Sequence, residues 1–180
     1  MSNRVFLLAK NNTTIGVAYN QNANTASKLK FVSDKATADG KNNYQVTSID
    51  SINTLLEKLD VSTFDNVCQI YVPSVIEEAI KAETYKFWLL TGKNSKDETV
   101  DPALMEVWQR FSDLMSQKGQ YFVFRSIKTC YLKDYQLNNP KILAKIDLFR
   151  RANDTYARYC KAEIDKLFPV TEEGTIPVVL

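Results

Sequence analysis

The sequence lacks the residues on which nucleophilic and zinc-dependent catalysis usually depend. The 180 residues include no histidine, which removes Ser-His and Cys-His pairs and every zinc site that uses histidine. Cys68, Cys130 and Cys160 are too few for a four-cysteine metal site and too scattered for a disulfide framework. Ser74 and Ser126 have no base to activate them. No residue set therefore supports an enzyme of these classes.

Basic residues gather in two parts of the chain. Residues 1–33 hold four Lys or Arg and no acid, and residues 118–161 hold ten against three, whereas residues 34–117 hold eight against fourteen acids. Tyrosines are interleaved with the second basic set, and cations beside aromatic rings can hold phosphates and stack bases. A mixed, solvated surface is the alternative interpretation. The candidate binding residues are Lys145, Arg150, Arg151, Tyr156, Arg158 and Lys161.

Length and composition indicate an ordinary globular protein. A chain of 180 residues, 44% hydrophobic and 24% charged, suits one domain with a real core. No apolar run approaches the roughly 18–20 residues that span a bilayer, and the apolar part of residues 1–8 is too short for a signal peptide. We expect no membrane association and a cytoplasmic location, the host cytoplasm if the protein comes from a phage.

Five stretches are predicted to be strands. The first two flank Asn11-Asn12 and read as a tight hairpin. The fourth is apolar and stops at Pro73, which has no N–H to give to a neighbouring strand, and we expect it to lie centrally in the sheet. The five strands are Arg4–Lys10, Thr13–Asn20, Lys28–Val32, Val67–Val72 and Gln120–Arg125.

The second predicted helix follows the fourth strand directly. Ser74 is expected to cap it, and Glu77 stands three residues later, where a capping box places its acid. The apolar spacing predicts one continuous helix to about Leu90, with Phe87 facing inward.

The other predicted helices also have start signals. Thr47 or Ser48 is expected to begin the first helix. Asp101-Pro102 is an N-cap followed by proline at the first helical position. Asn139-Pro140 opens a long last helix, and residues 168–180 are expected to form an extended tail, because its prolines oppose helix.

The element order is three strands, helix, strand, two helices, strand and final helix, which resembles the ribonuclease H-like fold. Several motifs look like those of that family, at matching places along residues 3–167. The resemblance implies an α/β fold, a five-stranded mixed sheet flanked by helices, with residues 1–167 as a single domain. The motifs are Asn42-Asn43, Ile70–Ser74, Val100–Leu104 with Trp108, Gln120–Arg125 and Asn153-Asp154.

The family's chemistry needs four carboxylates that converge on two Mg²⁺ ions, and Mg²⁺ requires oxygen ligands. Carried over position by position, these carboxylates fall on Ala9 or Lys10, Val46, Pro73 and Ala157. None of these residues is an acid. The resemblance therefore implies a degenerate member, without a bound metal or another cofactor and without enzyme activity.

The leading functional hypothesis is a catalytically inactive module that acts as a protein–protein adaptor or inhibitor. The Asn-, Thr- and Lys-rich, histidine-free composition suggests a phage protein, which would block a host defence or take part in the sorting or assembly of phage proteins. The alternative is a non-catalytic nucleic-acid-binding protein that uses residues 118–161. A third hypothesis is a divergent metal-dependent nuclease that recruits other acids, namely Asp50, Glu77, Glu78 or Asp154.

Overall fold

The structure, a computed structural model, describes most of the first 152 residues. The described ranges are 3–10, 12–20, 25–38, 40, 43–61, 67–129 and 140–152. The predicted tail at 168–180 lies outside them.

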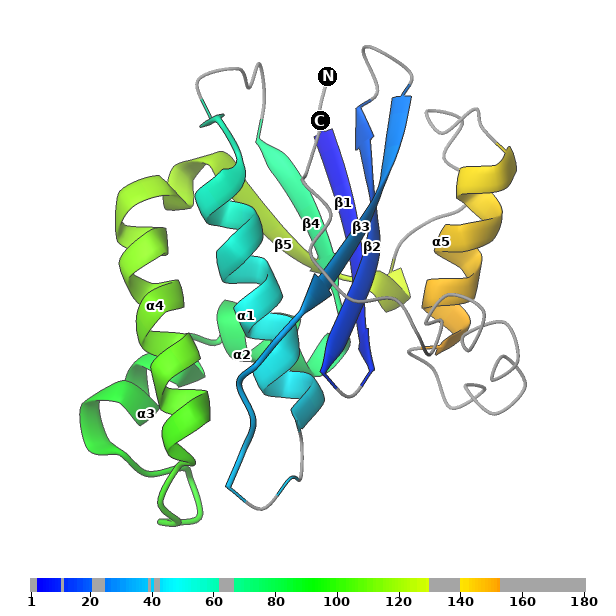
Figure 1. Ribbon diagram of the computed structural model, residues 1–180. Coiled ribbons are helices and arrows are strands. Elements are labelled where there is room, and N and C mark those ends of the chain that lie inside the picture. The colour runs from blue at the N-terminus through cyan, green and yellow to red at the C-terminus, as the bar shows by residue number, and fades with distance from the viewer. Residues whose placement is uncertain are drawn as a thin grey trace.

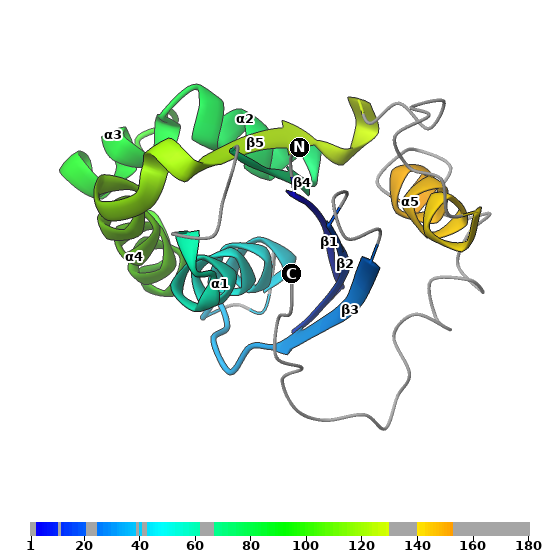
Figure 2. The same cartoon turned by 90° about the horizontal axis from the view of Figure 1, so that it is seen from above.

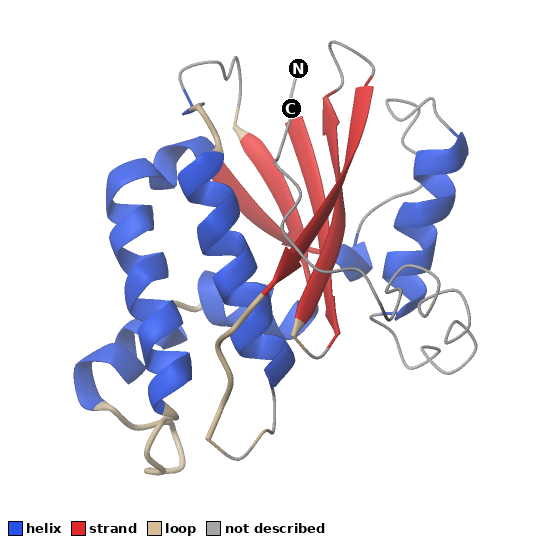
Figure 3. Ribbon diagram, in the orientation of Figure 1, coloured by secondary structure: helices blue, strands red, loops and turns tan. Residues whose placement is uncertain are grey.

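The strands, red in Figure 3, form one mixed sheet. Its order is β3-β2-β1-β4-β5, and the strands are labelled in Figure 1. β1, β2 and β3 are antiparallel neighbours, whereas β4 runs parallel to β1, and β5 runs parallel to β4. This order and these directions are those of the ribonuclease H-like fold, so the predicted fold class is confirmed. The strands are β1 (Asn3–Lys10), β2 (Thr13–Asn20), β3 (Thr25–Val32), β4 (Cys68–Val72) and β5 (Phe122–Ser126).

Helices cover both faces of the sheet (Figure 1). α1 to α4 pack on one face, and α5 packs on the other (Figure 2). None of the described helices is long and apolar enough to cross a bilayer. The helices are α1 (Asn43–Lys58), α2 (Ser74–Lys81), α3 (Thr84–Thr91), α4 (Pro102–Lys118) and α5 (Pro140–Ala152), with short 3₁₀ helices η2 (Gly119–Tyr121) and η3 (Ile127–Thr129).

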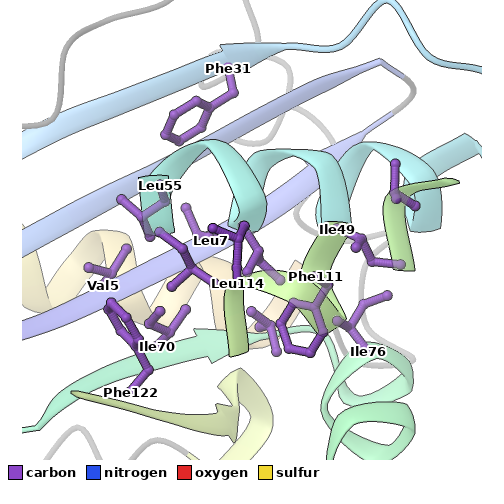
Figure 4. Close-up of a cluster of buried hydrophobic side chains, with 14 of the residues drawn as sticks. Val5, Leu7, Phe31, Ile49, Leu55, Ile70, Ile76, Phe111, Leu114 and Phe122 are labelled. Carbon is purple, nitrogen blue, oxygen red and sulfur yellow. The ribbon is translucent and has the colours of Figure 1, made fainter. Parts of the chain in front are cut away.

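Strand alternation gives the sheet two cores. Successive strand side chains point to opposite faces, so Val5 and Leu7 pack toward α1, and Phe6 and Leu8 pack toward α5. Figure 4 shows the larger core, where side chains from the sheet meet those of α1, α2 and α4. The predicted apolar residues of the last helix that the structure describes are buried: Ile142, Ile146 and Phe149.

The first helix begins earlier than predicted. It starts at Asn43, so Thr47 and Ser48 lie inside it and are buried, 0% and 4% exposed. Ser48 Oγ donates to the backbone oxygen of Tyr44 over 2.6 Å, a bond that satisfies a hydroxyl within a helix. The expectation that Thr47 or Ser48 begins α1 was therefore wrong. A serine or threonine hydroxyl can cap the start of a helix, but inside a helix it can instead donate to a backbone oxygen of the preceding turn.

The third strand is also longer than predicted. The ladder between β2 and β3 continues to the pair Asn20 and Thr25, so β3 begins three residues before Lys28. Main-chain pairing with β2 extends the strand through Ala26 and Ser27, which do not themselves favour strands.

The predicted helix from Ser74 to Leu90 is two helices. Glu83 takes a left-handed backbone conformation (φ 56°) between α2 and α3, which ends the first helix and redirects the chain. After this turn the Tyr85 ring stacks on Trp108, with centroids 4.9 Å apart. Phe87, expected to face inward, is 52% exposed instead.

Candidate functional site

The positions that match the family's carboxylates lie at one end of the sheet. β1 and β4 are parallel neighbours, and their register pairs Phe6 with Tyr71. The last residues of β1, including Ala9, therefore lie beside Pro73, which directly follows β4. Val46, from the first turn of α1, belongs to the core cluster that also holds the end of β4.

Apolar and basic side chains occupy these positions. Val46 is fully buried, Pro73 is buried, and Ala9 and Lys10 are half-buried. Across the ladder from Ala9, Thr14 is buried, and its Oγ1 has no hydrogen-bond partner among the residues that the structure describes. The fourth carried-over position, Ala157, lies outside the described residues.

The acids weighed as replacement ligands are placed differently from one another. Asp50 accepts a 2.7 Å hydrogen bond from Ser33 Oγ, which ties α1 to the segment after β3. Glu77 lies beside β5, and Asp154 is outside the described residues. Within the described ranges, no three Cys, Asp or Glu side chains gather as a metal site would require.

Ser74 does not cap α2 in the way the sequence predicted. Pro73 occupies the N-cap position, where its side chain makes no capping bond, and Ser74 is the first helical residue. The Ser74 and Ser126 hydroxyls lie 2.8 Å apart instead. Because Val72 pairs with Ser126, the first residue of α2 comes directly beside the end of β5. The predicted capping box with Glu77 was therefore wrong.

An open groove of about 630 Å³ runs beside β5. Its lining combines apolar side chains from β5, α2 and α4 with charges of both signs. The lining residues are Glu77, Ile80, Lys81, Met115, Phe122, Val123, Phe124, Arg125, Ser126 and Thr129.

A strongly basic region is formed where α5 covers the sheet. The described residues of β1, β2, β3, β5, η3 and α5 hold ten Lys or Arg and a single acid, Asp147. α1 to α4, on the opposite face, hold five Lys or Arg and six acids. The two basic parts of the sequence thus converge in space, and we call this side of the molecule the α5 face.

The cations of β3 are the part of the α5 face that the sequence analysis did not select. Lys28 pairs with Val17 and Lys30 with Ile15, and both partners belong to the core beneath α5. Lys28 and Lys30 therefore project on the side of the sheet that α5 covers. The acid-free first 33 residues and the alternation Lys-Leu-Lys were the signals available in the sequence.

Lys28 of β3 and Lys145 of α5 lie on the same side of the sheet. Burial and, after it, the positive charge and hydrogen-bonding contact of Lys28 lower the pKa of Lys145 from its ordinary value. Lys28 is exposed and Lys145 is half-buried. The two like charges add to the positive potential of the α5 face.

The remaining predicted binding residues are only partly described. Arg150 and Arg151 lie in the last turn of α5. Arg151 pairs with Asp147 over 3.2 Å, and the buried Nε of Arg150 has no hydrogen-bond partner within the described ranges. Tyr156, Arg158 and Lys161 lie outside the described residues.

Comparison with known proteins adds a structural likeness. No family model matches this sequence, and no curated protein matches it. Among solved structures, a foamy viral protease-reverse transcriptase in complex with an RNA/DNA hybrid is similar at 13% identity and a TM-score of 0.46. The likeness covers 80% of this chain and 19% of that one, so the chain spans about a fifth of that protein's length.

Proposed function

We propose that this protein is a binding module with a ribonuclease H-like fold that does not catalyse two-metal hydrolysis. The proposal is supported by the residues at the carboxylate positions, above all Val46, which is 0% exposed, and the buried Pro73. Two-metal catalysis needs several oxygen ligands around each cation pair. A valine and a proline supply none.

The partner that the geometry supports best is nucleic acid, bound on the α5 face. The observation that carries this choice is the ratio of ten cations to one acid among its described residues. Phosphate contacts supply most of the affinity of sequence-independent binding and need no metal ion. Loss of the carboxylates therefore leaves nucleic-acid binding chemically intact.

A protein adaptor or inhibitor is the second candidate, and the groove beside β5 favours it. This groove joins apolar residues such as Phe122 and Ile80 to the charged Lys81 and Arg125. An apolar centre with a charged rim is typical of protein interfaces. A phage setting, with host-defence blocking or protein sorting and assembly as roles, remains a proposal drawn from composition.

Two measurements test the proposed function. Purified protein is incubated with RNA–DNA hybrid, single strands and junctions in Mg²⁺ or Mn²⁺, and we expect no cleavage. Cleavage that disappears with Asp50→Ala or Asp154→Ala would show a divergent nuclease instead.

Partner capture from the native host, with and without nuclease treatment, separates the two binding candidates. Loss of every partner after nuclease treatment supports nucleic acid. If a partner survives nuclease treatment and still binds a variant with reversed charges at Arg150, Arg151 and Arg158, the result would favour the adaptor. It would also exclude the α5 face as the binding surface of that partner. The triple variant must first be shown to be folded by circular dichroism.

A further inference from the structure

β5 forms one edge of the sheet, because β4 is its only neighbour among the described strands (Figure 1). A strand with a neighbour on one side directs alternate N–H and C=O groups outward on the other side. The groove of about 630 Å³ is lined by every residue of β5, Phe122–Ser126. Successive strand side chains point to opposite faces, so the groove follows the edge of the sheet and not a single face.

The side of the groove toward α2 and α4 is apolar. Phe122 is buried in the larger core, and Phe124 packs against that core from the same face of β5. Ile80 of α2 and Met115 of α4 are half-buried and complete this wall. The wall can therefore bury apolar side chains of a chain that runs along β5.

The other side of the groove is positively charged. Val123 and Arg125 alternate with the two phenylalanines and therefore project toward the α5 face. Arg125 is exposed, and the ion pairs between described residues do not include it. On the side of α2, Glu77 and Lys81 contribute opposite charges that offset each other. The excess charge of the groove is thus carried by Arg125.

The two edges of the sheet differ in how well they would accept another strand. β3, the opposite edge, carries Lys28 and Lys30, and charged residues on an edge strand oppose pairing with another chain. β5 carries Val123 and Phe124 at its centre, and β-branched and aromatic residues favour strand pairing. β5 is therefore the edge better suited to strand addition.

We propose that the edge of β5 binds an extended peptide segment of a partner protein, which adds a strand to the sheet. The segment alternates apolar and acidic residues. Its apolar side chains enter the wall formed by α2 and α4, and its acidic side chains face Arg125. Main-chain hydrogen bonds supply affinity, and the alternation of side chains supplies specificity. The inference specifies the second candidate function and does not depend on nucleic-acid binding by the α5 face.

The probe is a fluorescently labelled synthetic peptide of about seven residues, in which valines alternate with glutamates. Its binding to the full chain is measured by fluorescence anisotropy with protein up to about 1 mM. The control peptide has the same composition, with the glutamates grouped at one end, and it should bind about tenfold more weakly. Equal binding of both peptides would indicate general attraction of acids to the α5 face and would overturn the proposal.

Charge reversal tests the orientation of the acidic side chains. Arg125→Glu should weaken binding of the alternating peptide about tenfold. Lys128→Glu, at an exposed position three residues later and outside the groove, makes the same change in charge and should alter binding less than about twofold. A peptide with lysines in place of the glutamates should bind Arg125→Glu more tightly than it binds the unaltered protein. Failure of this exchange would contradict the assigned role of Arg125.

Substitutions in the apolar wall test the other face of the peptide. Ile80→Ser and Met115→Ser should each weaken binding about tenfold, because the valines lose apolar contacts. Leu90→Ser, at a position of α3 that is 85% exposed and outside the groove, should have no effect. Native circular dichroism and cooperative urea unfolding are required of each variant before binding is measured.

Strand addition has a signature that repeats every second residue. An N-methyl group on a peptide nitrogen that faces β5 removes a hydrogen bond and should weaken binding about tenfold. On the next residue the nitrogen faces away from β5, so the same modification should leave binding unchanged. A scan of N-methyl groups along the peptide should therefore alternate between the two results. A uniform effect, or no binding of the alternating peptide, would overturn the proposal.

Failure of this inference can be told apart from failure of the nucleic-acid proposal. If the unaltered protein binds duplex DNA but not the alternating peptide, only the β5 site is wrong. If it binds the peptide with the alternating N-methyl pattern but binds no nucleic acid, the β5 site stands and the proposal for the α5 face fails. Analytical ultracentrifugation tests a second copy as the occupant. A concentration-dependent dimer that Ile80→Ser dissociates would overturn the partner peptide in favour of a second copy of this chain.

Discussion

The hydroxyls of Ser74 and Ser126 lie 2.8 Å apart and join the start of α2 to the end of β5. Ser126 Oγ also accepts the backbone N–H of Lys128 over 3.2 Å, so the same hydroxyl organises the turn into η3. β4 and β5 are parallel and in register at Val72 and Ser126. The contact thus ties the start of α2, which directly follows β4, to the neighbouring strand β5 at the carboxyl edge of the sheet.

Ser74→Ala should lower the free energy of unfolding by about 1 kcal/mol, the usual net contribution of a hydrogen bond. Urea denaturation of both single variants and of the double variant with Ser126→Ala forms a double-mutant cycle, which should show coupling of about 0.5 kcal/mol or more. If Ser74 acted as a helix cap, Ser126→Ala would leave the effect of Ser74→Ala unchanged. Ser95→Ala, in an exposed loop, is the matched control.

Gly16→Ala should destabilise the fold by about 3 kcal/mol or more. A Cβ at this position would stand 2.3 Å from the backbone oxygen of Phe6 and 2.7 Å from Leu7 Cδ2. The backbone oxygen belongs to the β1–β2 ladder and cannot move aside without breaking the pairing. In Gly119→Ala the new Cβ would meet only the flexible end of Met115 at 3.3 Å, so this control should unfold at nearly the same urea concentration as the unaltered protein.

Much of the fold could be predicted because local and tertiary preferences agree. Asp101 accepts the N–H of Ala103 over 2.9 Å with Pro102 at the start of α4, as the dipeptide indicated. Trp108 and Phe111 are 1% and 0% exposed, in agreement with the helical spacing. At these positions the capping signal, the helical period and the core all favour the same structure.

Predictions failed where tertiary contacts decide between local options. Ser74 could bond to its own helix end or to β5, and only the pairing of β4 with β5 selects the second option. Glu83 adopts a left-handed conformation that few non-glycine residues favour, so the break between α2 and α3 has no clear local signal. In the candidate site, Lys145 was selected from its charge alone. Lys28, which lowers the pKa of Lys145, lies 117 residues earlier in the sequence, so only the folded structure reveals this interaction.

Val46→Asp should cost about 3 kcal/mol or more and should not create nuclease activity. The valine is 0% exposed within the larger core, so the new carboxylate would be buried without a described partner. Thermal unfolding should show the loss, and Val75→Asp, at a position 48% exposed, should change the midpoint far less. Equal tolerance of both substitutions would indicate that Val46 borders a solvent-filled cleft instead of a filled core.

Cys68 makes stability depend on pH in the alkaline range. Burial raises the pKa of this thiol from 9.0 to about 12. Between these values the folded state holds a proton that the unfolded state has lost, so the stabilisation is complete below pH 9 and falls as the pH rises toward 12. Urea denaturation from pH 7 to 10.5 should show the stability advantage over Cys68→Ala shrinking above pH 9, by at most about 1.4 kcal/mol per pH unit. A constant difference would contradict the burial of this thiol.

Lys145→Met should stabilise the protein while it weakens nucleic-acid binding. The substitution removes a half-buried charge and its repulsion from Lys28, and it places an apolar chain next to Ile142 and Ile146. The gain should be less than about 1 kcal/mol, because water screens a partly exposed pair. Lys141→Met, at an exposed position one turn earlier in α5, is the control and should not share this gain.

The sign of the pH dependence makes this last prediction specific. The pKa of Lys145 in the folded state lies below its ordinary value of 10.5, with Lys28 of β3 facing it and, on α5 itself, Lys141 nearby and Asp147 engaged by Arg151. Below the lowered pKa, both states are protonated and the penalty of the charged pair is complete. As the pH rises toward 10.5, the folded state loses its proton first, so the penalty disappears. The stability advantage of Lys145→Met in urea should therefore be largest near neutral pH and should shrink on alkaline titration. An advantage that grows with pH would mean that Lys145 is stabilised as a cation in the folded protein, which would contradict the lowered pKa.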